Sequence, residues 1–409
     1  MKKILAMLLA LVMVLSLAAC GSAPAAEAPA ASGSAYKVAM ITDYGDITDQ
    51  SFNQTTWEAV VKFGEDNKIE YKYYKPTGDS TAARVASVEL AISEGYNVIV
   101  MPGYAFGGTI AEAAPSYPDV KFIALDVSKG DLLEGAIPLK GEAYDYNPDN
   151  WDLANYLDMS NVYCAIYQEE MCGYMAGYAA VKLGYTKLGF LGGMAVPAVI
   201  RYGYGFVQGV DAAAAELGIT VDLSYVYGNQ FFGDADITAY MDTWYANGME
   251  VVFACGGGIY MSAVDAAKKV GGKVIGVDVD QAGVIAKYAA GGDSATEEEI
   301  AKYADMTVTS AMKGLAPTTI DTLVDVVLNG KWADYAGKID NLGLVSGTDA
   351  SLNYVGIPTT TQYVDGLFTE ADMLALVAGM FDGSIAVSND TTNAPAVTNT
   401  NVEYLGNIK

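Results

Sequence analysis

Short apolar or β-branched runs alternate with helix-length segments from Lys37 onward, and this alternation restricts the fold more than any other feature. Amphipathic stretches such as 82–93, 201–217 and 263–270 separate neighbouring runs. Alternating strands and helices are typical of βαβ units built around parallel sheets. Nine runs are too many for one comfortable sheet, so the sequence predicts two doubly wound α/β lobes. The predicted strands are 37–41, 70–74, 97–101, 121–126, 161–167, 187–192, 222–227, 250–255 and 273–278.

Carboxylates follow three of these predicted strands. Asp43 and Asp126 each lie at a strand end, and Asp278 lies at another, with Asp280 two residues later. A single aspartate in such a position usually caps the next helix. Ligands of doubly wound sheets bind outside the carboxyl ends of the strands, so three such positions predict a carboxylate-lined cleft. Carboxylates in a cleft suit a neutral ligand with vicinal hydroxyls or ring N–H groups.

The composition excludes several classes of site. The 409 residues include no histidine, which removes Ser-His-Asp and Cys-His nucleophilic sites and His-ligated zinc. Acidic side chains number 49 against 23 basic ones, and the formal charge is -26. Nucleic acid polymers and anionic membrane surfaces should therefore be repelled. The predicted ligand is small, and neutral or cationic.

Motifs for phosphate, metal or hydrolytic chemistry are missing. The sequence has no Gly-x-x-x-x-Gly-Lys-Ser/Thr loop and no Gly-x-Ser-x-Gly elbow. Cys164, Cys172 and Cys255 lack the spacing of a metal or redox site, and we expect them to be buried. A disulfide between Cys164 and Cys172 stays open at this point. We expect neither a cofactor nor a metal.

The first residues are typical of an export signal rather than of a folded domain. An apolar stretch over 4–17 leads to Leu17-Ala-Ala-Cys20, which resembles a bacterial lipobox. We therefore predict a lipoprotein signal peptide over 1–19, and a lipidated Cys20 with a disordered tether over 20–35. The protein would then be exported and anchored to the outer face of the bacterial cytoplasmic membrane through Cys20.

Six segments, which follow one another along the chain, carry a resemblance to a known family. They are Asp49-Gln-Ser-Phe-Asn-Gln54 with Trp57, 169–177 (EEMCGYMAG), 188–209 (LGFLGGMAVPAVIRYGYGFVQG), Phe231-Phe-Gly-Asp234, 274–281 (VIGVDVDQ) and 309–313 (TSAMK). From about residue 36 to the tail, the sequence resembles the basic membrane protein family. This family comprises the purine nucleoside receptor A type of ABC transporter substrate-binding lipoproteins.

The resemblance implies a type I periplasmic-binding-protein fold, with two doubly wound parallel-sheet lobes joined by crossover strands. The chain would cross between the lobes near Gln168, Met306 and Leu344. It implies a monomeric binding protein, not an enzyme, that captures a nucleoside, with a purine preferred, and delivers it to a membrane permease. The implied lobes are 36–168 plus 307–343 (N-terminal) and 169–306 plus 344–409 (C-terminal).

Aromatic residues would hold the base of the ligand. By the resemblance, Phe52 stacks on one face, and Phe232 of the Phe231–Phe232 pair stacks on the other. Stacking between two rings suits any base. Core packing is the alternative role for either ring alone.

Polar residues would read the base edge. The resemblance assigns Asp43 and Asp126 to accept from ring N–H or amine groups, and Asn53 to contact the base or the ribose. Asp49 and Ser51 are expected to cap the helix that begins at Phe52.

The ribose would lie near the third carboxylate. The resemblance assigns Asp278 to the ribose hydroxyls, with Asp280 as the alternate, and Lys313 to the sugar. Gly256, in a glycine-rich turn, would allow the backbone to approach the sugar closely. A solvated lysine at a helix start is the alternative for Lys313.

Several departures from the family pattern keep other functions open. Tyr44 stands where a small residue is usual, Phe231 adds an aromatic ring, and the segments 141–161 and 291–303 are unusually long. The alternatives are the same fold with a simple sugar or signal molecule, a ligand sensor, and a nucleoside-cleaving enzyme.

Overall fold

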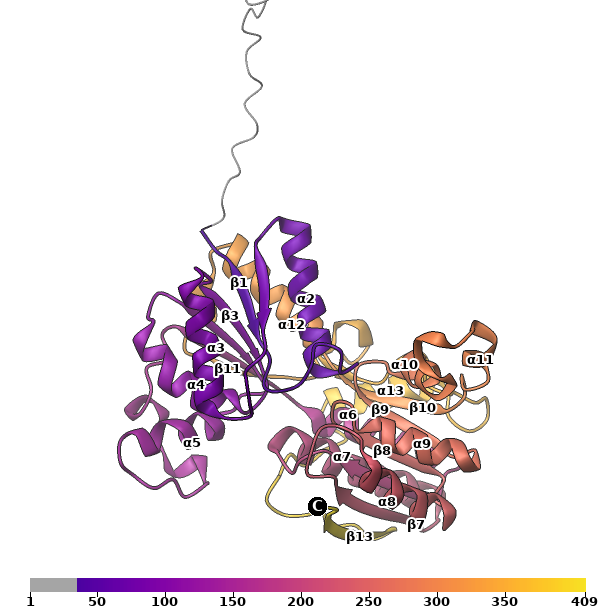
Figure 1. The fold of residues 1–409 in the computed structure, drawn as a ribbon. Coiled ribbons are helices and arrows are strands. Elements are labelled where there is room, and N and C mark those ends of the chain that lie inside the picture. Colours follow the sequence, from indigo (N-terminus) through magenta and orange to yellow (C-terminus); the bar gives the residue numbers. More distant parts are fainter. Residues whose placement is uncertain (1–34) are drawn as a thin grey trace, which may run out of the picture. The chain divides into compact units, whose positions relative to one another are not determined.

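The computed structural model describes residues 35–409. The predicted signal peptide over 1–19, Cys20 and the tether up to residue 34 lie outside these residues. Residues 36–409 form one unit built on two sheets, with helices on both faces of each sheet (Figure 1). The predicted class, two doubly wound α/β lobes, is confirmed.

The first sheet has the strand order β11-β5-β4-β3-β1-β2, and its neighbouring strands are parallel. Because successive side chains of a strand point to opposite faces, Val38 and Met40 of β1 pack on one side and Ala39 and Ile41 on the other. The strands are β1 (Val38–Ile41), β2 (Tyr71–Tyr74), β3 (Val98–Pro102), β4 (Lys121–Leu125), β5 (Val162–Tyr167) and β11 (Ile339–Leu342). Helices α2 (Phe52–Asn67) and α12 (Leu315–Leu323) cover one face, and α3 (Thr81–Ser93), α4 (Phe106–Ala113) and α5 (Lys129–Leu139) cover the other.

The second sheet has the strand order β12-β10-β9-β8-β6-β7-β13, with only the β12–β10 pair antiparallel among the described strands of this sheet. Its strands are β6 (Lys187–Gly192), β7 (Val221–Tyr227), β8 (Val251–Cys255), β9 (Lys273–Asp278), β10 (Thr307–Lys313), β12 (Val355–Gly356) and β13 (Thr400–Asn407). One face packs on α6 (Glu169–Lys182), α7 (Pro197–Leu217) and α13 (Glu370–Phe381). The other face packs on α8 (Ala235–Ala246), α9 (Tyr260–Val270) and α10 (Ala282–Ala290), and α11 (Glu297–Ala301) follows.

Helices α6 and α7 approach each other at glycines. A Cβ atom at Gly173 of α6 would lie 2.2 Å from the carbonyl oxygen of Tyr202, and one at Gly205 of α7 would lie 2.1 Å from that of Glu170. Both obstacles are backbone atoms, so neither position tolerates a side chain without a shift of the helices. The family-like segment 169–177 and the helical part of 188–209, from Pro197, therefore form one tightly packed helix pair.

Each predicted strand is present, with ends within one residue of the prediction. Strands β10 to β13 were not predicted, and β10 corrects the predicted lobe boundaries. The run Thr307–Lys313 is largely buried and hydrogen-bonds to β9 and β12, so it belongs to the second sheet. The predicted crossing near Met306 is therefore wrong. The chain leaves the second sheet after Lys313, before α12.

Two further observations concern the cysteines and the apolar character of the helices. Cys164, Cys172 and Cys255 are buried free thiols, so the disulfide left open between the first two is not formed. Between residues 35 and 409, no helix combines the length and the apolar character needed to cross a membrane.

Candidate functional site

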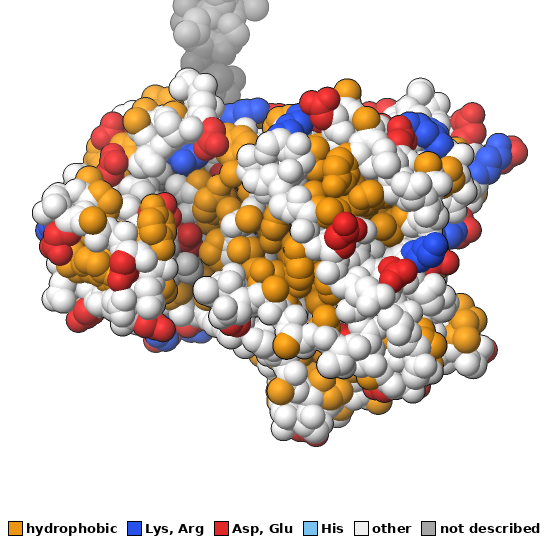
Figure 2. Space-filling model, turned by 90° about the horizontal axis from the view of Figure 1, so that it is seen from below, with side chains coloured by type: hydrophobic (Ala, Val, Ile, Leu, Met, Phe, Trp, Pro, Cys, Tyr) orange, Lys and Arg blue, Asp and Glu red, His pale blue; other side chains and the backbone are white. Residues whose placement is uncertain are grey.

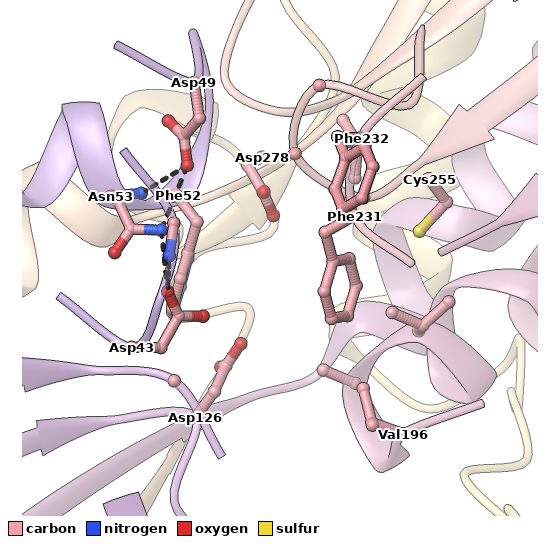
Figure 3. A pocket seen from close by; sticks show the side chains of 18 of the residues that line it. Asp43, Asp49, Phe52, Asn53, Asp126, Val196, Phe231, Phe232, Cys255 and Asp278 are labelled. Carbon is pink, nitrogen blue, oxygen red and sulfur yellow. Dashed lines mark hydrogen bonds between the residues drawn. The ribbon is translucent and has the colours of Figure 1, made fainter. Parts of the chain in front are cut away.

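A cavity of about 550 Å³ lies at the carboxyl ends of the strands, with walls from both lobes (Figure 3). Its position follows the rule for doubly wound sheets, in which ligands bind outside these strand ends. Eight of the nine residues predicted for ligand binding line it: Asp43, Phe52, Asn53, Asp126, Phe232, Gly256, Asp278 and Lys313.

Asp280 is the predicted residue that the structure does not bring to this cavity. One carboxylate oxygen accepts from the Ala282 backbone N–H at 3.1 Å, and the other accepts from the Thr360 hydroxyl at 2.8 Å. Asp280 is exposed and lines a separate cavity of about 380 Å³ behind Asp278 and Lys313. Of the two carboxylates that the sequence left as alternatives, only Asp278 faces the larger cavity.

The turn between β1 and α2 builds the first wall around the carboxylate of Asp49. This carboxylate accepts from the backbone N–H groups of Ser51, Asn53 and Gln54 at 2.9 to 3.0 Å, and from the Asn53 side chain at 3.1 Å. Asp49 therefore caps α2, as expected. Ser51 does not, because its hydroxyl donates to Asp278 at 2.6 Å and makes no capping bond.

Asp43 is fixed through one of its oxygens. Oδ1 accepts from the backbone N–H groups of Tyr44 and Gly45 at 2.6 and 2.7 Å, and from the Asn53 side chain at 3.3 Å. Figure 3 shows the bonds to Asn53 and the second oxygen of Asp43 directed to the cavity. Burial raises the pKa of Asp43, although these hydrogen bonds oppose the rise.

Asp126 and Asp278 share an uncommon backbone conformation. Their φ angles are 59° and 65°, in the left-handed region that aspartate adopts more readily than most residues. Such conformations cluster at functional sites, where the surrounding structure enforces them. Each sharp turn directs a carboxylate from a strand end into the cavity.

Two acceptors on the first wall lack partners. Within the described residues, Asp126 Oδ1 and Asn53 Oδ1 are buried and make no hydrogen bond. A buried acceptor without a partner costs about 1–3 kcal/mol, and Figure 3 shows the Asp126 carboxylate directed into the cavity, so this oxygen is prepared to accept from a ligand. Burial also raises the pKa of Asp126 to about 7, although Lys313 opposes the rise.

Lys313 connects the carboxylates of both walls. Its ammonium pairs with Asp126, and lies 3.3 Å from Glu169 Oε1 and 3.6 Å from Asp278 Oδ1. It also lies 4.7 Å from the ring centre of Phe52, a cation–π contact. Burial alone lowers the pKa of Lys313, but the carboxylates outweigh burial and raise this pKa well above its ordinary value. The lysine is buried in the cleft and is not a solvated lysine at a helix start.

Aromatic rings face each other across the cavity. Figure 3 shows Phe52 on one side and both Phe231 and Phe232 on the other. Phe231 is packed over glycines: a Cβ at Gly193 would lie 2.4 Å from its ring. Phe232 is freer, with 53% of its surface exposed. Both rings of the pair are therefore available to a flat ligand.

Further contacts join the lobes beside the cavity. The Gln281 side chain donates to the carbonyl oxygen of Gln50 at 3.0 Å. The hydroxyls of Tyr44 and Tyr104 lie 3.7 and 3.9 Å from the sulfur of Met194. Tyr44, noted as a departure from the family pattern, thus lies where the first lobe meets the second.

Sequence reasoning missed several residues around this site. Tyr104, Val196 and Met261 line the cavity, as does Tyr202, whose hydroxyl donates to Asp278 at 3.2 Å. Glu169 pairs with Lys313, and Arg201 pairs with Glu169. Glu169 and Arg201 both lie in segments that carry the family resemblance, but no spacing in the sequence connects them to Lys313.

Within the described residues, no group of three or more Asp, Glu, Cys or His could hold a metal ion.

Two lobes built on largely parallel sheets, with a cavity at the strand ends, define the type I periplasmic-binding-protein fold. Structure comparison agrees on the fold. A solute-binding protein from Aeropyrum pernix K1 is similar with a TM-score of 0.60 at 19% identity, covering 87% of this chain and 88% of that one. A solute-binding protein from Conexibacter woesei is similar with a TM-score of 0.59 at 18% identity, covering 87% of this chain and 99% of that one.

The chain belongs to the family described as ABC transporter substrate-binding protein, PnrA-like, whose model matches residues 36–343. The family is one of transport binding proteins, not enzymes. The chain is similar to the ABC transporter nucleoside-binding protein BmpA of Lactococcus lactis, with 25% identity over 337 residues, 79% of this chain and 84% of the relative.

Two further relatives match shorter parts. The CD4+ T-cell-stimulating antigen of Listeria monocytogenes is 29% identical over 259 residues, 60% of this chain and 63% of the relative. Basic membrane protein A1 of Borrelia garinii is 27% identical over 249 residues, which are 60% of this chain and 64% of the relative. The matched part is less than two thirds of the length of either relative.

Proposed function

We propose that the protein captures a nucleoside, with a purine preferred, and delivers it to the permease of an ABC transporter. One observation carries the proposal: Phe52 lies across the cavity from Phe231 and Phe232, and the carboxylate of Asp126, with one unpartnered oxygen, points into the same cavity. A base is flat and carries N–H donors at its edge, so it satisfies both features at once.

The remaining cavity residues suit the ribose. Asp278 and Lys313 offer the cavity a carboxylate and an ammonium 3.6 Å apart, and vicinal hydroxyls pair with both kinds of group. Gly256, with φ of 142°, lets the backbone approach the ligand there. Since the ligand is neutral, no cationic clamp for phosphate is required. The relative named as nucleoside-binding supports the same class.

Calorimetric titration of the purified full-length protein in detergent tests the proposal. Guanosine, inosine, adenosine, cytidine, uridine and free ribose would be compared in one buffer. We expect purine nucleosides to bind most tightly and ribose to bind weakly. Ribose that binds as tightly as any nucleoside would contradict the stacking argument and favour the sugar-binding alternative.

Asp126→Asn gives a second test, because it keeps the size of the side chain and replaces one acceptor by a donor. We expect a change in the ranking of the bases, with little effect on the affinity for ribose. A uniform loss for every ligand would show that Asp126 acts through the fold and not through the base edge.

We further propose that Cys20 is lipidated and holds the protein at the outer face of the cytoplasmic membrane. Cys20 lies outside the described residues, and the motif around it supports the proposal. Cys20→Ser should release the protein from the membrane fraction into the medium or periplasm. Retention of this variant in the membrane fraction would contradict the anchor.

A further inference from the structure

Glu169 and Arg201 form a buried ion pair directly behind Lys313. The Nε–H of Arg201 donates to Glu169 Oε2 at 2.6 Å, and Glu169 Oε1 lies 3.3 Å from the Lys313 ammonium. The Glu169 side chain is fully buried. Each oxygen of this carboxylate is thus committed to a different cation, so the side chain cannot turn without breaking a buried charged hydrogen bond.

Glu169 differs from the other two carboxylates around Lys313. Asp126 and Asp278 line the cavity, and both would exchange part of their contact with Lys313 for contacts with a ligand. Glu169 does not line the cavity. It is therefore the carboxylate that stays with Lys313 whether or not the cavity is filled.

The fold fixes both members of the pair. Glu169 is the first residue of α6, where the helix dipole favours a negative side chain, and it follows β5 where the chain passes to the second sheet. Arg201 lies on α7. The close approach of these helices at Gly173 and Gly205 sets the distance between Glu169 and Arg201.

We propose that Glu169, clamped by Arg201, is a positioning residue that keeps the Lys313 ammonium directed into the cavity when Asp126 and Asp278 engage a ligand. The inference rests on the proposed function in taking a nucleoside as that ligand. A buried ammonium needs a permanent counter-charge, and without Glu169 it would follow whichever carboxylate remains free.

A double-mutant cycle tests this role with guanosine as the probe and the full-length protein in detergent. Glu169→Gln should weaken binding by roughly 30-fold, the usual scale for breaking a buried charged pair. In a Lys313→Met background the same change should have no further effect, because Glu169 would act only through Lys313. Additive losses would overturn the inference.

Glu170→Gln is the matched control. This neighbouring carboxylate is buried but does not line the cavity, so binding should stay within about twofold of the native protein.

A second measurement needs no ligand. The side-chain nitrogen resonance of Lys313, assigned through Lys313→Arg, reports directly on the environment of the ammonium. Glu169→Gln should shift or broaden it, and Glu170→Gln should not. If Glu169→Gln fails to fold, Arg201→Gln should produce the same change. If no nucleoside binds the native protein, the proposed function fails and this resonance decides the inference, which an unchanged signal in Glu169→Gln would refute.

Discussion

The two walls of the cavity hold their polar groups by different means. In the first wall, Asp43, Asp49 and Asn53 bond to one another and to nearby backbone, all within one turn between a strand and a helix. In the second wall, Lys313 bonds to Glu169, which lies outside the cavity and 144 positions earlier, and to Asp126 of the first wall, 187 positions earlier. The first arrangement is local, and the second exists only when both lobes are folded.

Because of this difference, we expect substitutions in the two networks to affect different properties of the protein. Removing a residue from the local network breaks hydrogen bonds within one turn and leaves the other charges of the protein paired. Removing the central cation of the second network leaves two buried carboxylates, Asp126 and Asp278, without a counter-charge. Changes at Lys313 should therefore affect the whole protein, and changes in the turn after β1 should affect chiefly the cavity.

The largest expected effect comes from Lys313→Met. The variant keeps the length of the apolar stem but leaves Asp126 and Asp278 without a cation and Glu169 with Arg201 alone, so the free energy of unfolding should fall by about 3–5 kcal/mol. Chemical denaturation followed by circular dichroism measures this loss. Lys62→Met is the control, since the Lys62–Asp66 pair is exposed on α2, and no measurable change is expected there. Equal effects would show that the buried network contributes no more than a surface pair.

Glu170→Gln should instead stabilise the protein, and only above mildly acidic pH. Burial raises the pKa of Glu170 to about 7 from an ordinary value of 4.5, and its Oε2 makes no hydrogen bond within the described residues. The folded state therefore binds more protons than the unfolded state between these values, so the contribution of Glu170 to stability falls as pH rises through this window.

The neutral glutamine removes that loss. The gain should reach roughly 1–3 kcal/mol at pH 8 and vanish near pH 4, measured by urea denaturation at both pH values. Glu112→Gln, at an exposed position on α4, should show no such pH dependence. A gain of equal size at pH 4 would show that ionisation of Glu170 is not the cause.

The nucleoside affinities of Phe52→Ala and Phe232→Ala compare the contributions of the two walls to stacking. Removing the Phe52 ring should weaken every nucleoside alike, by about 1–3 kcal/mol of binding free energy, because stacking does not distinguish the bases. Phe232→Ala should cost less, since this ring is 53% exposed and Phe231 lies beside it. Calorimetry measures both variants, with Phe381→Ala, exposed and outside the cavity, as the control. A larger loss for Phe232→Ala would show that the second wall carries most of the stacking.

The same contrast explains what the sequence allowed us to predict. The strand pattern and the strand-end aspartates placed the cleft, because runs such as 37–41 and 121–126 are apolar and end in polar turns. Strand β10 was missed since Thr307–Lys313 mixes small, polar and apolar residues. It becomes a strand only by pairing with β9 and β12, which lie elsewhere in the sequence.

The site shows the same limit at the level of side chains. Asp43, Phe52 and Asn53 lie in one short motif, so the resemblance could assign them together. Asp278 and Asp280 could not be separated, because the left-handed turn at Asp278 that aims one inward and leaves the other outside has no signature in the sequence. Glu169 and Arg201 meet Lys313 only through the packing of α6 on α7.

We expect the smallest change in stability from Asp49→Ala. This variant separates two roles of Asp49, which caps α2 and holds the Asn53 side chain. Asp49→Ala removes the carboxylate that caps α2, so the free energy of unfolding should fall by about 1 kcal/mol. It also releases the Asn53 side chain, so the affinity for nucleosides should fall as well. Thr369→Ala is the matched control, because Thr369 caps α13 away from the cavity through a bond from the Asp372 backbone N–H. Both variants should lose similar stability, measured by chemical denaturation, but only Asp49→Ala should lose affinity in calorimetry. If Asp49→Ala kept its full affinity, the first wall would hold Asn53 through Asp43 alone, and the local network would be simpler than its hydrogen bonds indicate.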